Sequence, residues 1–179
     1  EHASGARKIM QELGIEEIPI DINEVVSAKR QTIPGMAVWY LKGLEDAKVQ
    51  GACKSCWMDQ NYGDKTIFNG WPPMLDGLLT YPEFKPRSTW WVYKAYGDIT
   101  GELVDVSGGT KFMKGLAGID KENQKVRILL GRSGWGLNRV SVTVTNISRA
   151  PWLVDGGKVK VFAQRIPNSG WESLVEPIT

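Results

Sequence analysis

The distribution of apolar residues changes near Thr100, and this change constrains the fold more than any single motif does. Before it, segments with apolar residues at helical spacing alternate with short apolar runs, as in parallel strands joined by crossover helices. After it, short β-like segments follow one another between glycine-rich turns, as in a small antiparallel sandwich. We therefore predict an α/β part over residues 1–101 and an antiparallel β-sandwich over residues 102–179.

The first part is predicted to run helix, strand, helix, strand, helix. The expected helices cover residues 4–13, 36–48 and 86–101, and the expected strands cover residues 18–24 and 49–57. Two parallel strands cannot make a sheet that buries both of its faces. We therefore expect this part to be incomplete by itself.

The second part contains one segment with a very clear strand pattern, RVSVTVTNI. Its valines would share one face, and its serine and threonines would share the other. This alternation is typical of a half-buried antiparallel strand. The remaining predicted strands lie in the segments ELVDVS, FMKGLAGID, KVRILLGRS, KVKVFAQRI and ESLVEPI.

The overall composition excludes some classes of partner. Hydrophobic residues make up 42% and charged residues 23% of the 179 residues, as in a soluble globular domain. The formal net charge of +2 is small and the basic residues are scattered, so we expect no nucleic-acid partner. No run approaches the ~18 apolar residues of a membrane helix, so we expect no membrane partner.

The two cysteines, Cys53 and Cys56, form a Cys-x-x-Cys pair with three possible meanings: a redox motif, half of a zinc site or a local disulfide. A zinc site needs two further ligands, and the only histidine, His2, is far away in the sequence. The residues after Cys56 are typical of a loop, whereas a redox pair is expected to open a helix. We therefore favour a short disulfide or two plain thiols, and we expect no metal and no cofactor.

The chain also has eight tryptophans. Tryptophan at a surface can stack on a sugar ring, although packing in the core is the commoner role of any single tryptophan. The adjacent pair Trp90–Trp91 favours the first reading. Asn146-Ile147-Ser148 is a glycosylation sequon, and we expect a secreted or extracellular protein.

The order of four segments resembles the C-terminal part of a clan A glycoside hydrolase. These segments are GIEEIPIDINEVV, PGMAVWYLKGLEDAKVQGACKSCW, PRSTWWVYKAYGDITGELVDVS and AGIDKENQKVRILLGR. The β-xylosidase and α-iduronidase family is the nearest one. The resemblance implies a fold made of the last strands (seven and eight) and helices of a (β/α)8 barrel, followed by the β-sandwich.

The resemblance also implies a retaining glycoside hydrolase that cleaves β-linked glycosides, with a carbohydrate substrate. Asn23-Glu24 matches the acid/base motif after the fourth strand of such barrels, but the number of elements that follow assigns Glu24 to strand seven, as the nucleophile. Trp57 would form an apolar platform for the sugar, with Asn23 as a second substrate-binding residue. A retaining enzyme needs two carboxyl groups about 5–5.5 Å apart. The acid/base group is therefore expected on a separate or missing N-terminal polypeptide that completes the barrel.

Three alternatives compete with this hypothesis. Glu24 could be an ordinary exposed carboxylate at the edge of a loop. The chain could be a non-catalytic carbohydrate-binding module that uses Trp135, Trp152 or Trp171. It could also be a redox protein built on the two cysteines, although that reading explains only four residues.

Overall fold

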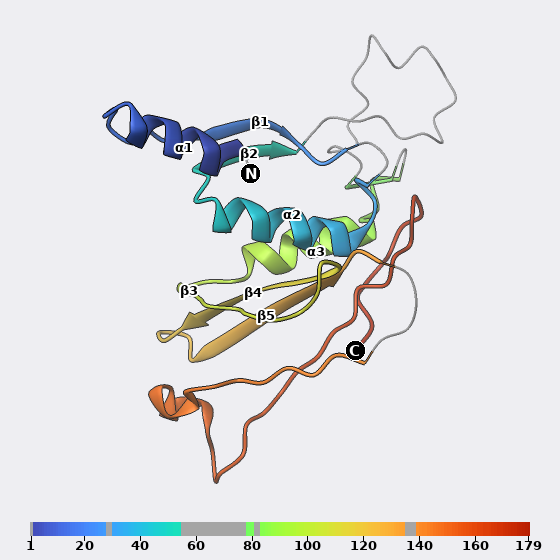
Figure 1. Ribbon diagram of the computed structural model, residues 1–179. Coiled ribbons are helices and arrows are strands. Elements are labelled where there is room, and N and C mark those ends of the chain that lie inside the picture. The colour runs from blue at the N-terminus through green and yellow to red at the C-terminus, as the bar shows by residue number, and fades with distance from the viewer. Residues whose placement is uncertain (1, 28–29, 55–77, 81–82, 135–138) are drawn as a thin grey trace.

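The fold is described from a computed structural model, which describes residues 2–27, 30–54, 78–80, 83–134 and 139–179. Figure 1 shows a small α/β layer, a pair of helices, a second small sheet, and two long extended segments beyond it. Within the described part of the chain, no helix has both the length and the apolar character to cross a lipid bilayer.

The first part contains the predicted order of helices and strands. The elements are α1 (His2–Glu12), β1 (Asp21–Val25), α2 (Pro34–Asp46), β2 (Gly51–Lys54) and α3 (Ser88–Gly97). Strands β1 and β2 pair in parallel, with Asp21 opposite Gly51, so α2 is the crossover helix between them. Pro34 stands at the start of α2, where its fixed φ favours the first turn and its missing N–H leaves no helical hydrogen bond unmade.

The second part contains three paired strands, β3 (Glu102–Val104), β4 (Met113–Asp120) and β5 (Lys125–Arg132). They form one antiparallel sheet in the order β3–β4–β5. The strands predicted in ELVDVS, FMKGLAGID and KVRILLGRS correspond to these three elements. Two short 3-10 turns follow, η2 (Ile147–Arg149) and η3 (Pro151–Leu153).

The predicted fold class, the end of a (β/α)8 barrel followed by a β-sandwich, is wrong. In the part of the chain that the structure describes, three α-helices accompany only a two-stranded and a three-stranded sheet. Two parallel strands cannot close into a barrel, which needs eight. The segments around residues 139–145 and 159–164 belong to no sheet, so the second sheet of a sandwich is absent there. Their alternating sequence favours strands, but a strand forms only where a second backbone supplies hydrogen bonds.

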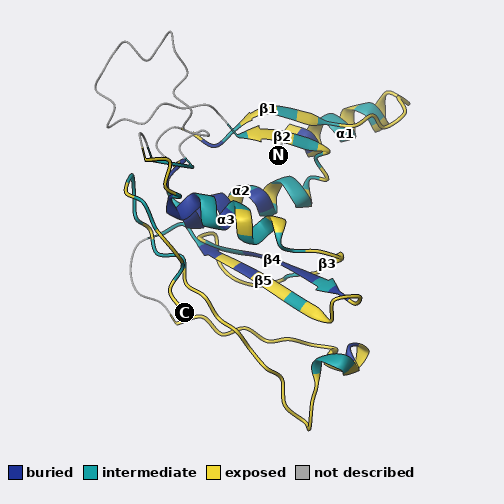
Figure 2. Cartoon of the chain, turned by 180° about the vertical axis from the view of Figure 1, so that it is seen from behind, coloured by how far each residue is buried: buried dark blue, intermediate teal, exposed yellow. Residues whose placement is uncertain are grey.

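One hydrophobic core joins the two parts of the chain. Helix α2 packs on β4, β5 and α3, and its first half is buried, as Figure 2 shows in dark blue. The boundary predicted between residues 101 and 102 stays a prediction, and the core takes residues from both sides of it. The buried members of this core are Ala37, Val38, Leu41, Val92, Leu116 and Leu129.

Two glycines allow α2 to approach β5 closely. A Cβ atom on Gly35 would lie 1.7 Å from the backbone oxygen of Arg132. A Cβ atom on Gly131 would lie 2.3 Å from the Cβ atom of Val38. No side chain fits at either position without moving the helix away from the strand. The approach of α2 to β5 therefore depends on these two glycines.

Candidate functional site

The candidate site lies at the carboxyl end of β1. Glu24 is the fourth residue of this five-residue strand, and the side chains of Asn23 and Glu24 are both exposed. Strands β1 and β2 point in the same direction, so the carboxyl ends of both strands lie at one edge of the small sheet (Figure 1). In open α/β sheets, ligands bind outside this edge. Glu24 therefore occupies a position from which a carboxylate can reach a ligand.

The backbone of β1 is irregular at the two polar residues. Ile22 pairs with Ala52 and Val25 pairs with Lys54, so Asn23 and Glu24 together lie opposite one residue, Cys53. This is a β-bulge, in which two residues on one strand face a single residue on the other. Bulges redirect side chains and occur often beside active sites. In a regular strand, the side chains of neighbouring residues point to opposite faces. The bulge changes this alternation at Asn23 and Glu24, and both residues are exposed.

A strained residue follows the bulge. Val26 has φ +72°, a left-handed conformation, and only 7% of the residue is exposed. This conformation is a clear outlier for a β-branched residue, and such strain costs about 1–3 kcal/mol. Strained backbones persist only where the surroundings hold them, and they cluster at functional sites. The strain two residues after Glu24 supports a functional role for this part of the chain.

Two polar residues shortly before α2 are buried. Gln31 is 1% exposed and Thr32 is 8% exposed, although both are polar. Two backbone hydrogen bonds lie nearby, from the amide of Arg30 to the oxygen of Ser27 and from the amide of Ile33 to the oxygen of Arg30. Buried residues therefore lie on both sides of the connection, Val26 directly after β1 and Gln31 and Thr32 shortly before α2.

The second carboxylate on β1 does not accompany Glu24. Asp21 lies at the opposite end of the strand, beside Gly51, where its Oδ1 atom is 2.6 Å from the position of a Cβ on that glycine. Three residue steps of a strand separate the Cα atoms of Asp21 and Glu24 by about 10 Å, whereas retaining glycosidases use two carboxyl groups about 5–5.5 Å apart. This spacing does not favour Asp21 as the proton donor for a reaction at Glu24.

Of the remaining residues singled out in the sequence, some lie outside the described part of the chain. Trp57 and Cys56 lie outside the described residues, and so does Trp135. Cys53 is exposed and has a free thiol, but the choice between a disulfide and two plain thiols also depends on Cys56 and stays a prediction. The described residues contain no group of three or more His, Cys, Asp or Glu side chains that could hold a metal ion.

Several of the aromatic side chains have structural contacts. The guanidinium of Arg87 lies 5.2 Å from the ring centre of Trp171, and its Nε donates to the carbonyl of Trp171 at 2.8 Å. The indole of Trp91 donates to the carbonyl of Leu174 and meets Trp90 edge to face. These contacts fasten the C-terminal segment to α3. Nothing in them favours a sugar-binding platform, so the binding-module alternative stays a prediction.

The position of Glu24 near a strand end is predictable from the sequence, whereas the bulge and the strained Val26 behind it were not predicted. One signal for the bulge was available. The apolar residues Ile22 and Val25 are three positions apart, which breaks the two-residue alternation of a regular strand. No pattern in the sequence predicts the left-handed conformation of Val26, because valine is strongly disfavoured in that region of backbone space.

The comparisons with known proteins point to glycosidases. No family model matches the chain. Over 135 residues it is 28% identical to a 3-O-β-L-arabinopyranosyl-α-L-arabinofuranosidase of Bifidobacterium pseudocatenulatum, covering 73% of this chain and 12% of that protein. Identity to a 3-O-α-D-galactosyl-α-L-arabinofuranosidase of Bifidobacterium longum subsp. longum is also 28%, over 73% of this chain and 11% of that protein.

A solved structure, N2152 from Neocallimastix frontalis, is also similar. The two structures superpose with a TM-score of 0.60 at 30% sequence identity, over 73% of this chain and 31% of that chain. The present chain thus spans about a tenth of the length of the curated relatives it matches. The chain is related to glycoside hydrolases, which confirms the resemblance at this level. Membership of clan A and of the xylosidase and iduronidase family stays a prediction.

Proposed function

We propose that this chain is part of a retaining glycoside hydrolase that acts on arabinofuranosyl glycosides, with Glu24 as the nucleophile. One observation carries the proposal: a chain related to arabinofuranosidases presents an exposed glutamate on a β-bulge at the carboxyl end of a parallel strand. The buried, strained Val26 behind it adds support. An ordinary surface carboxylate needs neither feature.

In this reaction the carboxylate of Glu24 attacks the anomeric carbon of the sugar. The bond from that carbon to the leaving oxygen breaks, a second carboxyl group protonates the oxygen, and a covalent glycosyl-enzyme forms. The second group, now ionised, then removes a proton from water, which hydrolyses the glycosyl ester and releases Glu24. Asn23, beside Glu24 on the bulge, is proposed to contact a sugar hydroxyl, and Trp57 is proposed to cover an apolar face of the ring.

The linkage is a separate part of the proposal. The resemblance in the sequence implied β-linked glycosides, and that linkage stays a prediction. The curated relatives are named as α-L-arabinofuranosidases. We therefore propose an α-L-arabinofuranosidic bond as the first one to test.

The second carboxyl group is proposed to come from a further polypeptide segment. No additional strand pairs with the outer edge of β1 or β2 in the part of the chain that the structure describes. A two-stranded parallel sheet is too small to be stable by itself, and its exposed edges can accept further strands. A segment that pairs there would be a neighbour of Glu24 and could place a proton donor beside it.

The test is a comparison of Glu24→Gln with Glu16→Gln in a polypeptide that contains this chain and supplies the second carboxylate. Glu16 is also exposed, but it precedes β1. With an aryl α-L-arabinofuranoside as substrate, Glu24→Gln should lower kcat by at least about a thousandfold, whereas Glu16→Gln should leave it within about twofold.

A second variant separates a nucleophile from a residue that only supports the fold. Glu24→Gly leaves space for a small anion, so azide should restore turnover and yield a glycosyl azide of inverted configuration. Activity of Glu24→Gln near that of the unmodified protein would refute the assignment. Loss of activity without rescue by azide would remove Glu24 from the nucleophile role.

A further inference from the structure

Two extended segments, residues 139–145 and 159–164, lie next to the β4–β5 sheet without joining it. We call them the arms. They are connected through η2, η3 and a turn in which Asp155 and Lys158 form two backbone hydrogen bonds of 2.9 Å. Every residue of both arms is exposed, as the yellow chain in Figure 2 shows. Among the residues that the structure describes, neither arm has a backbone hydrogen-bond partner.

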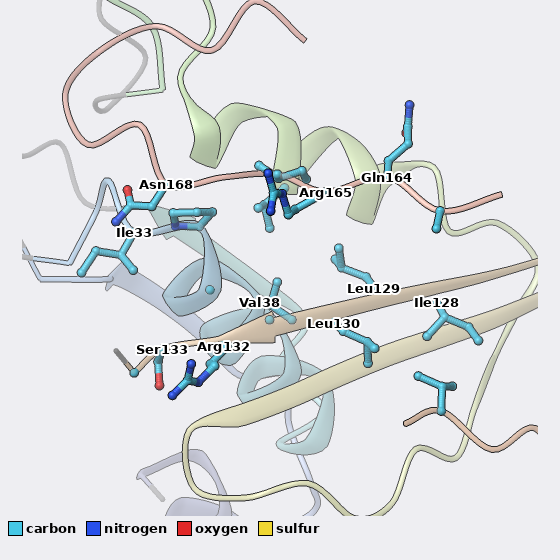
Figure 3. Close-up of a pocket in the computed structure, with 18 of the residues that line it drawn as sticks. Ile33, Val38, Ile128, Leu129, Leu130, Arg132, Ser133, Gln164, Arg165 and Asn168 are labelled. Atoms are coloured by element: carbon cyan, nitrogen blue, oxygen red, sulfur yellow. The ribbon is translucent and has the colours of Figure 1, made fainter. Parts of the chain in front are cut away.

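The arms border an open cleft of about 840 Å3. Figure 3 shows Val38 from α2, Leu129 from β5 and Arg165 from the C-terminal segment around this space. Its walls are mainly apolar, and four of the apolar side chains from the arms are more than half exposed. These are Val142 at 52%, Val144 at 53%, Val161 at 79% and Phe162 at 76%.

The sequence of the arms is poorly suited to an unpaired chain in water. The first arm alternates valine with serine or threonine, residues that favour a pleated, half-buried strand. An exposed backbone edge beside an apolar face is the arrangement to which an extended peptide adds as a further strand. A small apolar ligand could fill the cleft but would leave the backbone of the arms unpaired. Only another strand satisfies both the backbone and the apolar side chains.

The charge of this region indicates the composition of that strand. Residues 139–165 contain five basic side chains and one acidic side chain, Asp155. A second copy of the chain would present the same basic arms, and like charges across an interface are unfavourable. An acidic partner is complementary instead. The five basic residues are Arg139, Arg149, Lys158, Lys160 and Arg165.

We propose that the arms bind an extended polypeptide segment with alternating apolar and acidic side chains. The segment pairs with an arm as a β-strand, places its apolar side chains in the cleft and directs its acidic side chains toward the basic residues. This interaction surface is independent of Glu24 and of the glycosidase function, so either proposal can fail without the other.

The binding test uses the full chain and an octapeptide of alternating valine and glutamate, with blocked ends and a fluorescent label. Saturable binding is expected in fluorescence anisotropy, together with slower hydrogen exchange of amides in at least one arm. A valine–lysine octapeptide should bind at least tenfold more weakly. No binding up to millimolar peptide, equal binding of the lysine peptide, or unchanged exchange in both arms would overturn the proposal.

Proline substitutions distinguish strand pairing from simple filling of the cleft. Amides of successive residues in a strand point to opposite edges, and proline removes one amide. Each arm is tested with proline at two neighbouring positions: Val142→Pro and Thr143→Pro in the first arm, and Lys160→Pro and Val161→Pro in the second. In at least one arm, one of the two substitutions should weaken peptide binding at least tenfold, whereas the other should change the affinity by less than threefold. Because these amides have no partner in the described structure, the circular dichroism spectrum should not change. Equal binding by all four folded variants would refute strand pairing.

Discussion

Gly35→Ala offers a sharp test of the packing between α2 and β5. The added Cβ atom would lie 1.7 Å from the backbone oxygen of Arg132 and 2.4 Å from its carbonyl carbon, whereas an ordinary contact begins at 3.4 Å. The obstacle is the backbone at the end of β5, so no side chain can rotate to relieve it. Helix α2 and strand β5 must therefore separate by well over an ångström.

The size of the effect follows from two opposing contributions. Overpacking of a core typically costs about 1–3 kcal/mol and sometimes more. Alanine gains at most about 1 kcal/mol over glycine in a helix, and less in the first turn, where Gly35 lies. The separation would also expose Val38, which is 1% exposed, and Leu129. We therefore expect Gly35→Ala to lower the free energy of unfolding by about 2 kcal/mol or more.

The matched control is Gly43→Ala, in the same helix. A Cβ atom on Gly43 meets nothing within 4 Å. Alanine should therefore stabilise the protein there by about 0.5–1 kcal/mol. Urea unfolding, followed by circular dichroism, measures both variants. The two substitutions should change stability in opposite directions. A Gly35→Ala variant as stable as Gly43→Ala would show that the contact between α2 and β5 is not as tight as described.

Three further expectations concern titration and reactivity. Burial, and then the hydrogen bond to Glu45, raise the pKa of Tyr96 to about 12, so its contribution to stability should be complete below pH 10 and lost as pH rises toward 12. In Tyr96→Phe the free energy of unfolding should therefore fall less steeply between pH 10 and pH 12. The same slope in both proteins would contradict this role of Tyr96. The hydroxyl of Thr100 is the main cause that lowers the pKa of Asp120 to about 2, so Asp120 should stabilise the fold above its ordinary pKa and lose that effect as pH falls toward 2. Thr100→Val should move this loss to higher pH in an acid titration, and an identical titration would argue against the bond. Cys53 lies opposite the bulge, so its alkylation should slow when a saturating arabinofuranosyl ligand occupies the site beside Glu24. Mass spectrometry of the labelled peptide measures the rate of alkylation, and an unchanged rate would place the ligand elsewhere.

The helices and strands in the first part of the chain could be predicted because the residues within each element largely determine its conformation. The apolar spacing in residues 36–48 predicted a helix, and the structure has α2 at Pro34–Asp46. The short apolar run ending at Glu24 predicted a strand, and β1 ends one residue later, at Val25. The helical spacing of apolar residues, with Pro34 at its start, specifies α2, and a short apolar run rich in isoleucine specifies β1, in both cases without reference to distant residues.

The larger architecture could not be predicted, because it depends on partners that the local pattern does not specify. The alternation in residues 139–145 indicates a strand but says nothing about which backbone will pair with it, and the described chain offers none. The barrel was an inference from the order of segments, and two parallel strands do not supply it. At the candidate site, the position of Glu24 was predictable, whereas the conformation of Val26 depends on packing that only the folded chain shows.

Covalent trapping of the nucleophile tests the proposed role of Glu24 most directly. A 2-fluoro arabinofuranosyl inhibitor with a good leaving group slows hydrolysis of the glycosyl-enzyme, so the sugar stays attached to the carboxylate that attacked it. It would be applied to a polypeptide that contains this chain and the proton donor, followed by digestion and mass spectrometry. We expect one equivalent of label on Glu24 and none on Glu16. Label on another carboxylate of an active enzyme, with Glu24 unmodified, would contradict the assignment of Glu24 as the nucleophile.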